Sequence, residues 1–317
     1  MPDPMPTRVR PMLATLVAEP FRALGWIFEE KYDGDRVLAY KDGRRVRMLS
    51  RNGIDRTDSF SAIADAIGAL AARQLILDGE VIVRDRHGVS QFQLLQQRKG
   101  KTGYAVFDCL FRNGRDLRRE PLSLRREELR AALKPGRAVF VSRRLSADGI
   151  KAFREAKKRG FEGIVAKNLA SAYVGKRSRD WLKVKVHQED EFVIVGFTRP
   201  AGARKHFGAL LLAARDKGEL RFAGKVGTGF DARSLAELHA RLAPLAVASL
   251  KLANAPRERG VTFVKPRLVA QIHYRELTAD KKLRQPVYLG LRSDKRASEV
   301  EMPVAAKVQD KQGIAGR

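Results

Sequence analysis

The feature that most constrains this sequence is a change of pattern at residues 187–190. Before it, apolar runs of strand length alternate with stretches of helical spacing, and after it strand-length runs predominate. A chain of 317 residues is longer than one typical domain, and its 44% hydrophobic content is enough for two cores. We therefore expect one domain over residues 1–187, a second over 188–302, and a disordered tail over 303–317.

Residue spacing predicts an α+β first domain and a strand-rich second one. In the first, strands are expected at residues 26–29, 36–40, 46–50, 75–77, 81–83, 104–110, 164–167 and 182–186. Helices are expected there at residues 61–72, 123–133 and 147–159, the last ending at Gly160. In the second, strands are expected at residues 191–197, 207–214, 220–226 and 268–274, with a helix at 232–242. That composition favours a small barrel, with an OB-fold as the leading candidate.

The chain carries a large excess of positive charge. Its 63 Lys and Arg residues against 36 acidic residues give a formal net charge of +27. This predicts a polyanionic partner, because neutralising phosphates releases counterions. Nucleic acid is favoured over a membrane, since no apolar run reaches the roughly 20 residues of a membrane helix. The start of the chain lacks a signal pattern, so we expect a cytoplasmic protein. The single Cys109, in a buried-strand pattern, excludes an internal disulfide framework.

One lysine stands at a special position. Residues 29–36 read EEKYDGDR, which places Lys31 at the end of an apolar strand beside an Asp-Gly turn. A lysine amine is a nucleophile only when deprotonated, and neighbouring cations with partial burial favour that form. A solvated surface lysine is the ordinary alternative in so basic a chain, and the residues elsewhere in the sequence decide between the two.

The run KYDGDR resembles motif I of the covalent nucleotidyltransferases, Lys-x-Asp-Gly-x-Arg. This superfamily contains DNA ligases, RNA ligases and mRNA capping enzymes, in which the motif lysine attacks the α-phosphate of a nucleotide. The resemblance therefore implies that Lys31 is the catalytic nucleophile, and that Arg36 belongs to the nucleotide-binding residues.

Two further motifs of that family follow in its order. Residues 50–53 read SRNG, and the resemblance implies that Arg51 contacts the sugar or phosphate of the nucleotide. Residues 77–80 read LDGE and resemble motif III, which implies that Glu80 approaches the ribose and the metal ion. Each run would otherwise be an ordinary turn after a strand.

The base-stacking and metal-binding motifs come next. Residues 104–108 read YAVFD and resemble motif IIIa, which implies that Phe107 stacks on the purine; a core phenylalanine is the alternative. Residues 162–167 read EGIVAK and resemble motif IV, which implies that Glu162 is a magnesium ligand. Carboxylate oxygens are what Mg²⁺ takes from proteins when it is bound to phosphate.

Phosphate-binding cations complete the series. Residues 181–185 read WLKVK and resemble motif V, and strand alternation projects Lys183 and Lys185 to one face. A looser resemblance to motif VI begins at residues 284–286 and ends at residues 291–295. It implies that three cations orient the β- and γ-phosphates, and a basic DNA-facing segment is the alternative. These cations are Arg284, Arg292 and Lys295.

Within the superfamily, the sequence resembles ATP-dependent DNA ligases, over roughly residues 8–298. Glu29 matches the position that accepts a hydrogen bond from the adenine amino group, with an exposed strand-end carboxylate as the alternative. The chain most resembles the bacterial ligase D catalytic module and the stand-alone ligase C, and residues 204–211, RKHFGALL, support that subgroup. Only 30 residues precede Lys31, so we expect no amino-terminal DNA-encircling domain.

The resemblance implies a nucleotidyltransferase (ATP-grasp-like) domain of antiparallel sheets and helices, followed by an OB-fold domain. The implied enzyme seals 5′-phosphate/3′-hydroxyl nicks through lysyl-AMP and a DNA-adenylate, in DNA repair or end joining. ATP is its adenylate donor, and Mg²⁺ its metal, with Mn²⁺ as a substitute. Expected partners are nicked or broken duplex DNA and a Ku-type end-binding protein, and a monomer is expected. The alternatives are an RNA ligase or capping-type enzyme, and a non-catalytic basic nucleic-acid-binding protein.

Overall fold

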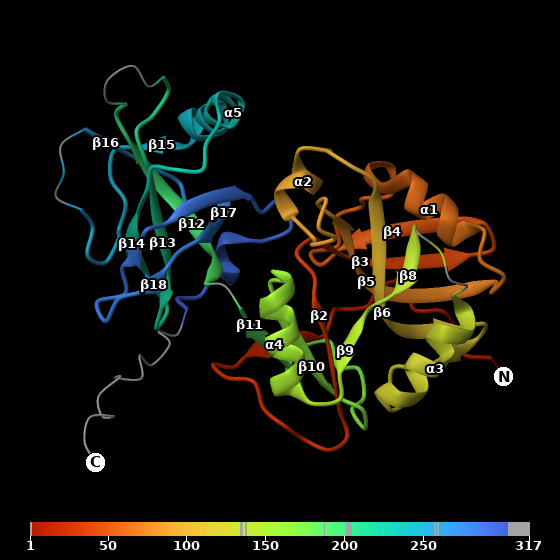
Figure 1. Ribbon diagram of the computed structural model, residues 1–317. Helices are drawn as coiled ribbons and strands as arrows, with labels where there is room; N and C mark the ends of the chain where they lie inside the picture. The colour runs from red at the N-terminus through yellow and green to blue at the C-terminus, as the bar shows by residue number, and fades with distance from the viewer. Residues whose placement is uncertain are drawn as a thin grey trace, which may run out of the picture. The chain divides into compact units, whose positions relative to one another are not determined.

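The chain divides into two compact units, Met1–His187 and Gln188–Arg317 (Figure 1). A computed structural model describes residues 2–133, 136, 138–186, 188–200, 205–256, 258 and 260–303. Each unit has its own hydrophobic core. The tail expected over residues 303–317 lies outside the described residues from residue 304 onward.

Unit 1 is built on two sheets that are antiparallel except where β1 meets β11 and β6 meets β8. The five-stranded sheet has the order β1-β11-β10-β2-β9, with bounds β1 Leu13–Leu16, β2 Trp26–Lys31, β9 Arg144–Ser146, β10 Gly163–Asn168 and β11 Arg177–Lys185. The six-stranded sheet has the order β4-β3-β5-β6-β7, with β8 on β6. Its bounds are β3 Asp35–Asp42, β4 Arg45–Ser50, β5 Gln74–Val83, β6 Thr102–Arg112, β7 Arg115–Asp116 and β8 Val139–Val141.

Helices cover these sheets because their apolar stripes need a partner (Figure 1). Ile63 and Ile67 of α1 join the cluster that contains Leu75 of β5, and Ala152 and Ala156 of α4 join a separate one. The helical bounds are η1 Asp58–Phe60, α1 Ser61–Gly68, α2 Phe92–Gln96, α3 Leu122–Ala132 and α4 Gly149–Arg159.

Local sequence explains where α4 begins and ends. The Asp148 side chain accepts hydrogen bonds from the backbone N–H groups of Ile150 and Lys151, at 2.9 and 3.0 Å. These contacts satisfy donors that the first turn of a helix leaves open. Gly160 ends the helix in the left-handed conformation, with φ of 73°. The helix predicted at residues 147–159 is therefore confirmed to within two residues.

A third cluster joins residues of both sheets. Leu38 and Tyr40 of β3 and Ile76 of β5 belong to it, together with Trp181 of β11. By strand alternation, several of the residues that the sequence predicts for nucleotide binding lie on the same faces of these strands. The sole cysteine, Cys109, is fully buried in β6, which confirms its predicted place in a core strand.

The prediction that residues 78–80 separate two strands is wrong. These residues lie inside the continuous ten-residue strand β5, which has irregularities after Ile76 and Asp78. Gly79 serves a close approach rather than a turn. A Cβ atom there would lie 2.6 Å from the Tyr104 ring and 2.7 Å from the carbonyl oxygen of Ala105. The helix predicted at residues 61–72 was also too long, since α1 ends at Gly68.

Unit 2 is a curled, mainly antiparallel sheet with one α-helix among its described residues. β12 pairs with β13 and also, at its two ends, with β16 and β17, and such a change of partner bends a sheet toward a barrel. The strands are β12 Glu189–Thr198, β13 Leu210–Asp216, β14 Glu219–Val226, β15 Ala246–Val247, β16 Val261–Val264, β17 Val269–His273, β18 Glu276–Leu277, β19 Leu283–Arg284 and β20 Val287–Leu291. The helices are α5 Ala232–Leu242, η2 Ala243–Leu245 and η3 Ala297–Glu299.

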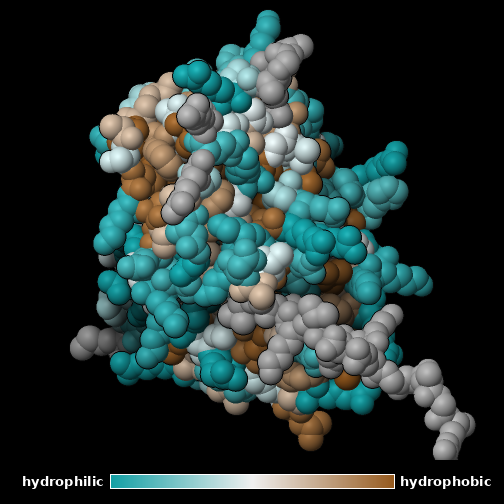
Figure 2. Space-filling model, turned by 90° about the vertical axis from the view of Figure 1, so that its left-hand side faces the viewer, coloured by the Kyte–Doolittle hydropathy of each residue, from teal (hydrophilic) through white to brown (hydrophobic). Residues whose placement is uncertain are grey.

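The surface is rich in hydrophilic side chains, as expected for a chain with 31% charged residues. Figure 2 shows hydrophilic side chains over most of the face that it presents, with smaller apolar areas between them. None of the helices in the described parts of the chain has the length and apolar content that crossing a membrane requires.

Arg125 and Asp108 form a buried ion pair that we expect to stabilise unit 1. Both side chains are 0% exposed, and the guanidinium donates to both carboxylate oxygens at 2.8 and 2.9 Å. We expect Arg125→Met to lower the free energy of unfolding of unit 1 by about 3–5 kcal/mol, because it leaves Asp108 buried and unpaired. Tryptophan fluorescence in urea measures this unit alone, since Trp26 and Trp181 are the only tryptophans and both lie in it.

Arg130→Met is the matched control, because Arg130 is an exposed arginine of the same helix. It should leave the urea midpoint unchanged. Equal midpoints for the two variants would contradict the stabilising role of the buried pair.

Candidate active site

Strand register gathers several of the predicted residues on one face of the five-stranded sheet. Lys31 of β2 lies opposite Gly163 of β10, which lies opposite Lys185 of β11. Two residues along, Glu29 and Lys183 flank Val165 in the same way. Directly opposed residues project to the same face, and so do residues two apart in a strand. Glu29, Lys31, Lys183 and Lys185 therefore share one face.

The expected nucleophile is paired with the expected metal ligand. The ammonium group of Lys31 forms an ion pair with the Glu162 carboxylate, and their side chains are 19% and 9% exposed. Gly163, which follows Glu162 in the sequence, allows β10 and β11 to approach closely, because a Cβ atom there would lie 2.1 Å from the carbonyl oxygen of Val184. Any side chain at position 163 would force this part of the sheet apart.

Glu29 is buried, at 1% exposure, which excludes the alternative of an exposed strand-end carboxylate. One oxygen accepts from the Ser142 hydroxyl at 2.8 Å and from the Arg126 guanidinium. The other contacts the Lys167 ammonium at 2.7 Å. Burial alone would raise the pKa of Glu29, but Lys167 and Arg126 outweigh it and the pKa is lowered. Glu29 is therefore a carboxylate held ionised inside the protein.

The six-stranded sheet contributes Arg36, which is held by Asp78. Its guanidinium donates to the two carboxylate oxygens at 3.0 and 2.6 Å. Tyr173 donates its hydroxyl hydrogen to the same carboxylate at 2.7 Å and accepts from the backbone N–H of Met12 at 3.0 Å. Burial alone would lower the pKa of Arg36, but Asp78 raises it above its ordinary value. Arg36 is thus fixed by a bidentate pair.

Phe107 lies among cations and a second ring. Its centroid is 5.8 Å from that of Trp181, with the rings at 82°. The Lys167 ammonium lies 4.2 Å from the Phe107 centroid, and the Arg36 guanidinium carbon lies 5.3 Å from it. Phe107 is half-buried and also contacts core residues, so packing and stacking on a base remain compatible here.

The predicted metal ligands lie on different sheets. Glu162 precedes β10, whereas Glu80 lies in β5 opposite Arg36. Among the residues that the structure describes, there is no group of three or more His, Cys, Asp or Glu side chains suited to a metal ion. The donors present therefore fit Mg²⁺ only as an ion that takes one or two carboxylate oxygens and completes its shell with phosphate and water.

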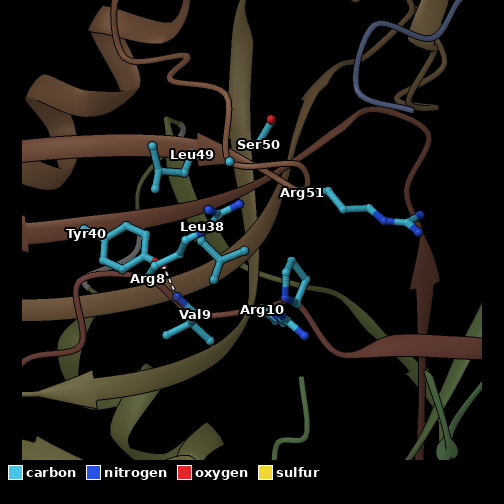
Figure 3. Close-up of a pocket in the computed structure, with 10 residues that line it drawn as sticks. Arg8, Val9, Arg10, Leu38, Tyr40, Leu49, Ser50 and Arg51 are labelled. Atoms are coloured by element: carbon cyan, nitrogen blue, oxygen red, sulfur yellow. Dashed lines mark hydrogen bonds between the residues drawn. The ribbon is translucent and has the colours of Figure 1, made fainter. Parts of the chain in front are cut away.

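The turn that carries Arg51 is braced by the N-terminal segment. Gly53 has φ of 79°, a left-handed conformation that favours glycine, and the Arg8 guanidinium lies 2.7 Å from the position that a Cβ atom would take there. The backbone N–H of Val9 donates to the Tyr40 hydroxyl at 2.8 Å. Figure 3 shows Arg51 extending away from the small pocket that the N-terminal segment lines. Sequence reasoning missed Arg8, which no motif contains.

Of the three motif VI cations, the structure brings two together. Arg292 forms a bidentate pair with Asp294 at 2.8 Å, and Lys295 contacts Glu191 at 3.3 Å. The Arg292 guanidinium also approaches Glu191, at 4.0 Å. Arg284 lies apart in the β18–β19 hairpin, where it is exposed and contacts Glu276 at 2.6 Å.

Comparison with known proteins bears on this arrangement. The family model described as ATP dependent DNA ligase domain matches residues 11–185, and the model of the ATP dependent DNA ligase C terminal region matches residues 203–295. The chain belongs to the ATP-dependent DNA ligase family. Its sheets and helices confirm the predicted nucleotidyltransferase fold followed by an OB-fold domain.

Individual relatives and solved structures resemble the chain over nearly its whole length. It is 42% identical over 311 residues to the multifunctional non-homologous end joining protein LigD of Pseudomonas aeruginosa, covering 94% of the chain and 37% of that protein. It is 34% identical to a DNA ligase of Thermococcus fumicolans, covering 92% and 57%. A solved structure of mycobacterial DNA ligase D complexed with ATP and MES has a TM-score of 0.68 and 36% identity, covering 93% and 98%. The chain thus spans less than half the length of its LigD relatives.

Glu30 precedes the expected nucleophile and points to the face of β2 opposite to Lys31. Its burial lowers the stability of the fold in a pH-dependent way. It is 3% exposed, and among the described residues neither carboxylate oxygen has a hydrogen-bond partner. The nearest cation is Arg143, at 3.7 Å. Burial raises the pKa of Glu30 to about 7, and Arg143 and Arg84 offset this only in part. Burying the ionised form therefore costs stability.

We expect Glu30→Gln to stabilise this protein at high pH and not at low pH. The folded-state pKa of about 7 lies above the ordinary 4.5, so the native state keeps a proton that the unfolded chain releases between these values. The free energy of unfolding of the wild type therefore falls as pH rises through this window, and levels off above it. At pH 8 the variant should be more stable by about 1–3 kcal/mol, and at pH 4.5 by little.

Urea unfolding of both proteins, followed by tryptophan fluorescence across this pH range, measures the difference. Glu127→Gln, at an exposed glutamate of α3, is the control and should show no such window. A pH-independent difference between wild type and Glu30→Gln would contradict the assignment.

Proposed function

We propose that this chain joins 5′-phosphate and 3′-hydroxyl ends in nicked duplex DNA through a lysyl-adenylate on Lys31. One observation carries the proposal: Lys31 contacts Glu162 on the sheet face that also carries Lys183, Lys185 and the buried Glu29. That face offers a nucleophile, a carboxylate for its proton, cations for phosphate and an acceptor for the base.

The first step forms the enzyme adenylate. The Lys31 amine attacks the α-phosphorus of ATP, an N–P bond forms, and the bond to pyrophosphate breaks. Glu162 lies against the ammonium group and is placed to hold the proton that must leave before attack. Lys183 and Lys185 stabilise the charge that develops on phosphate. Mg²⁺, or Mn²⁺, would be held by Glu162 and Glu80 and would supply charge neutralisation on the phosphates.

Two further steps complete ligation. An oxygen of the DNA 5′-phosphate attacks the adenylate phosphorus, which breaks the N–P bond, returns a proton to Lys31 and leaves a DNA-adenylate. The 3′-hydroxyl then attacks the 5′-phosphorus, forms the phosphodiester bond and releases AMP. The net charge of +27 supports binding to duplex DNA through phosphates without reading bases.

The remaining site residues keep their predicted roles as proposals. Phe107 would stack on adenine and Glu29 would accept from its amino group, while Arg36, Arg51 and Glu80 would lie toward the ribose and phosphates. The support for Phe107 is its position between cations at half-burial.

The motif VI cations divide into two cases. For Arg292 and Lys295, contact with phosphate is supported by their shared approach to Glu191. For Arg284 no comparable contact supports a phosphate role, and its exposure fits a DNA-facing residue equally well.

We infer that residues 1–187 act as the adenylation domain and residues 188–302 as the OB-fold domain. The two family models, which match residues 11–185 and 203–295, support this division. The end joining named for the LigD relatives supports a role in repair of broken DNA. A Ku-type end-binding protein is the partner that we propose. We further propose that the enzyme acts as a monomer in the bacterial cytoplasm, where chromosomal DNA lies.

Covalent labelling tests the nucleophile. We expect Lys31→Ala to abolish incorporation of label from α-labelled ATP into denatured protein, because the variant lacks the amine that would form the N–P bond. Its salt-sensitive affinity for nicked DNA should remain within about twofold, since one of many cations is lost. Lys151→Ala, at an exposed lysine of α4, is the control and should label fully. Undiminished labelling of Lys31→Ala would refute the nucleophile.

Nucleotide and acceptor choice separate the proposed reaction from its relatives. The wild type should take label from ATP and not from GTP, and should seal nicked DNA faster than nicked RNA. Label from GTP alone would indicate a capping-type enzyme, and preferential sealing of RNA an RNA ligase. Labelling with neither nucleotide would indicate a non-catalytic binding protein.

A further inference from the structure

Two consecutive arginines of α3 reach into the interior of unit 1. Arg125 pairs with Asp108 of β6, and Arg126 pairs with Glu29 of β2, and the two arginines are 0% and 4% exposed. The Arg126 guanidinium also donates to the carbonyl oxygen of Phe107 at 3.4 Å. Arg126 therefore connects the strand that carries the proposed base acceptor to the strand that carries the proposed stacking ring.

The contacts of Glu29 leave little acceptor capacity unused. A carboxylate has about four acceptor sites on its two oxygens. Arg126 and the Ser142 hydroxyl use one oxygen, and Lys167 contacts the other. Three donors therefore leave about one site, on the oxygen that faces Lys167. Because the carboxylate is buried and its neighbours fix it, that site has a single direction.

The charge of the residues around Glu29 also determines which group its remaining acceptor site can bind. With Lys167 and Arg126 beside it, Glu29 is ionised and can only accept hydrogen bonds. The amino group of adenine donates at the position where guanine and hypoxanthine carry a carbonyl oxygen. A buried carboxylate facing a carbonyl oxygen leaves both acceptors unsatisfied, which a binding site rejects strongly.

We propose that Arg126, with Ser142, is a positioning residue that gives this ligase its preference for adenine over 6-oxopurine nucleotides. It acts through Glu29, by holding one carboxylate oxygen so that the other presents its open site to the base. Arg126 lies in α3, outside every motif that the sequence shows. The inference rests on the proposed function, because it concerns the base of the nucleotide that adenylates Lys31.

The ratio of ATP to inosine triphosphate tests the proposal. Formation of the covalent Lys31 adduct is measured with each nucleotide, and the two kcat/KM values are compared. We expect Arg126→Ala to lower the ATP preference by about tenfold or more, the loss expected for a hydrogen bond to a charged group. Ser142→Ala removes a neutral donor from the same oxygen and should lower the preference by about threefold. The exposed Arg130→Ala should leave the ratio unchanged.

The ratio separates positioning from general damage. Loss of structure lowers labelling by both nucleotides and leaves their ratio as in the wild type. If Arg126→Ala does not fold, Ser142→Ala decides alone. A wild-type ratio in either folded variant would overturn the proposal. Absence of covalent labelling in the wild type itself would instead overturn the proposed function, so the two failures are distinguishable.

Discussion

Charges buried in the interior of unit 1 require opposite charges beside them, and this requirement organises the site. Isolated ionised groups cannot be buried without large cost, whereas paired and hydrogen-bonded ones can. Four such pairs join different elements of the unit: Arg36 with Asp78, Arg125 with Asp108, and Glu29 with both Arg126 and Lys167. Together they fix α3 and strands of both sheets around Phe107. Positions of the proposed nucleotide-binding residues therefore depend on the same contacts that stabilise the domain.

Much of the site was predictable because its residues lie at strand ends in short local patterns. Alternation along residues 181–185 predicts that Lys183 and Lys185 share a face, and the register of β10 and β11 agrees. Local pattern failed where long-range packing decides. The Asp-Gly-Glu run resembles a turn, yet Gly79 continues β5, where it pairs with β3 and β6 and leaves room for the Tyr104 ring. The burial of Glu29 and the part played by Arg126 depend on an approach of α3 to β2 that no spacing reveals.

The family assignment concerns the whole chain, whereas the contacts of individual side chains concern the proposed site. The family models cover both units, and the LigD relatives extend well beyond the stretch matched here. Unit 1 contains the proposed nucleophile, the proposed phosphate-binding cations and the proposed base acceptor within its own sheets. In unit 2, Arg292 and Lys295 approach the same acidic side chain, whereas Arg284 does not. The described residues therefore support the proposed adenylation step more fully than the roles proposed for unit 2.

The buried Cys109 has a practical consequence. It is inaccessible, and burial raises the pKa of its thiol to about 12, so hardly any thiolate forms at neutral pH. Maleimide reagents react with thiolates, and the native protein presents none to them. Two cysteines, one introduced at a chosen surface position in each unit, would thus be the only thiols that a fluorophore labels. Energy transfer between two such dyes would report the distance between the two units with and without added ATP or DNA, and Cys109 would contribute no background labelling.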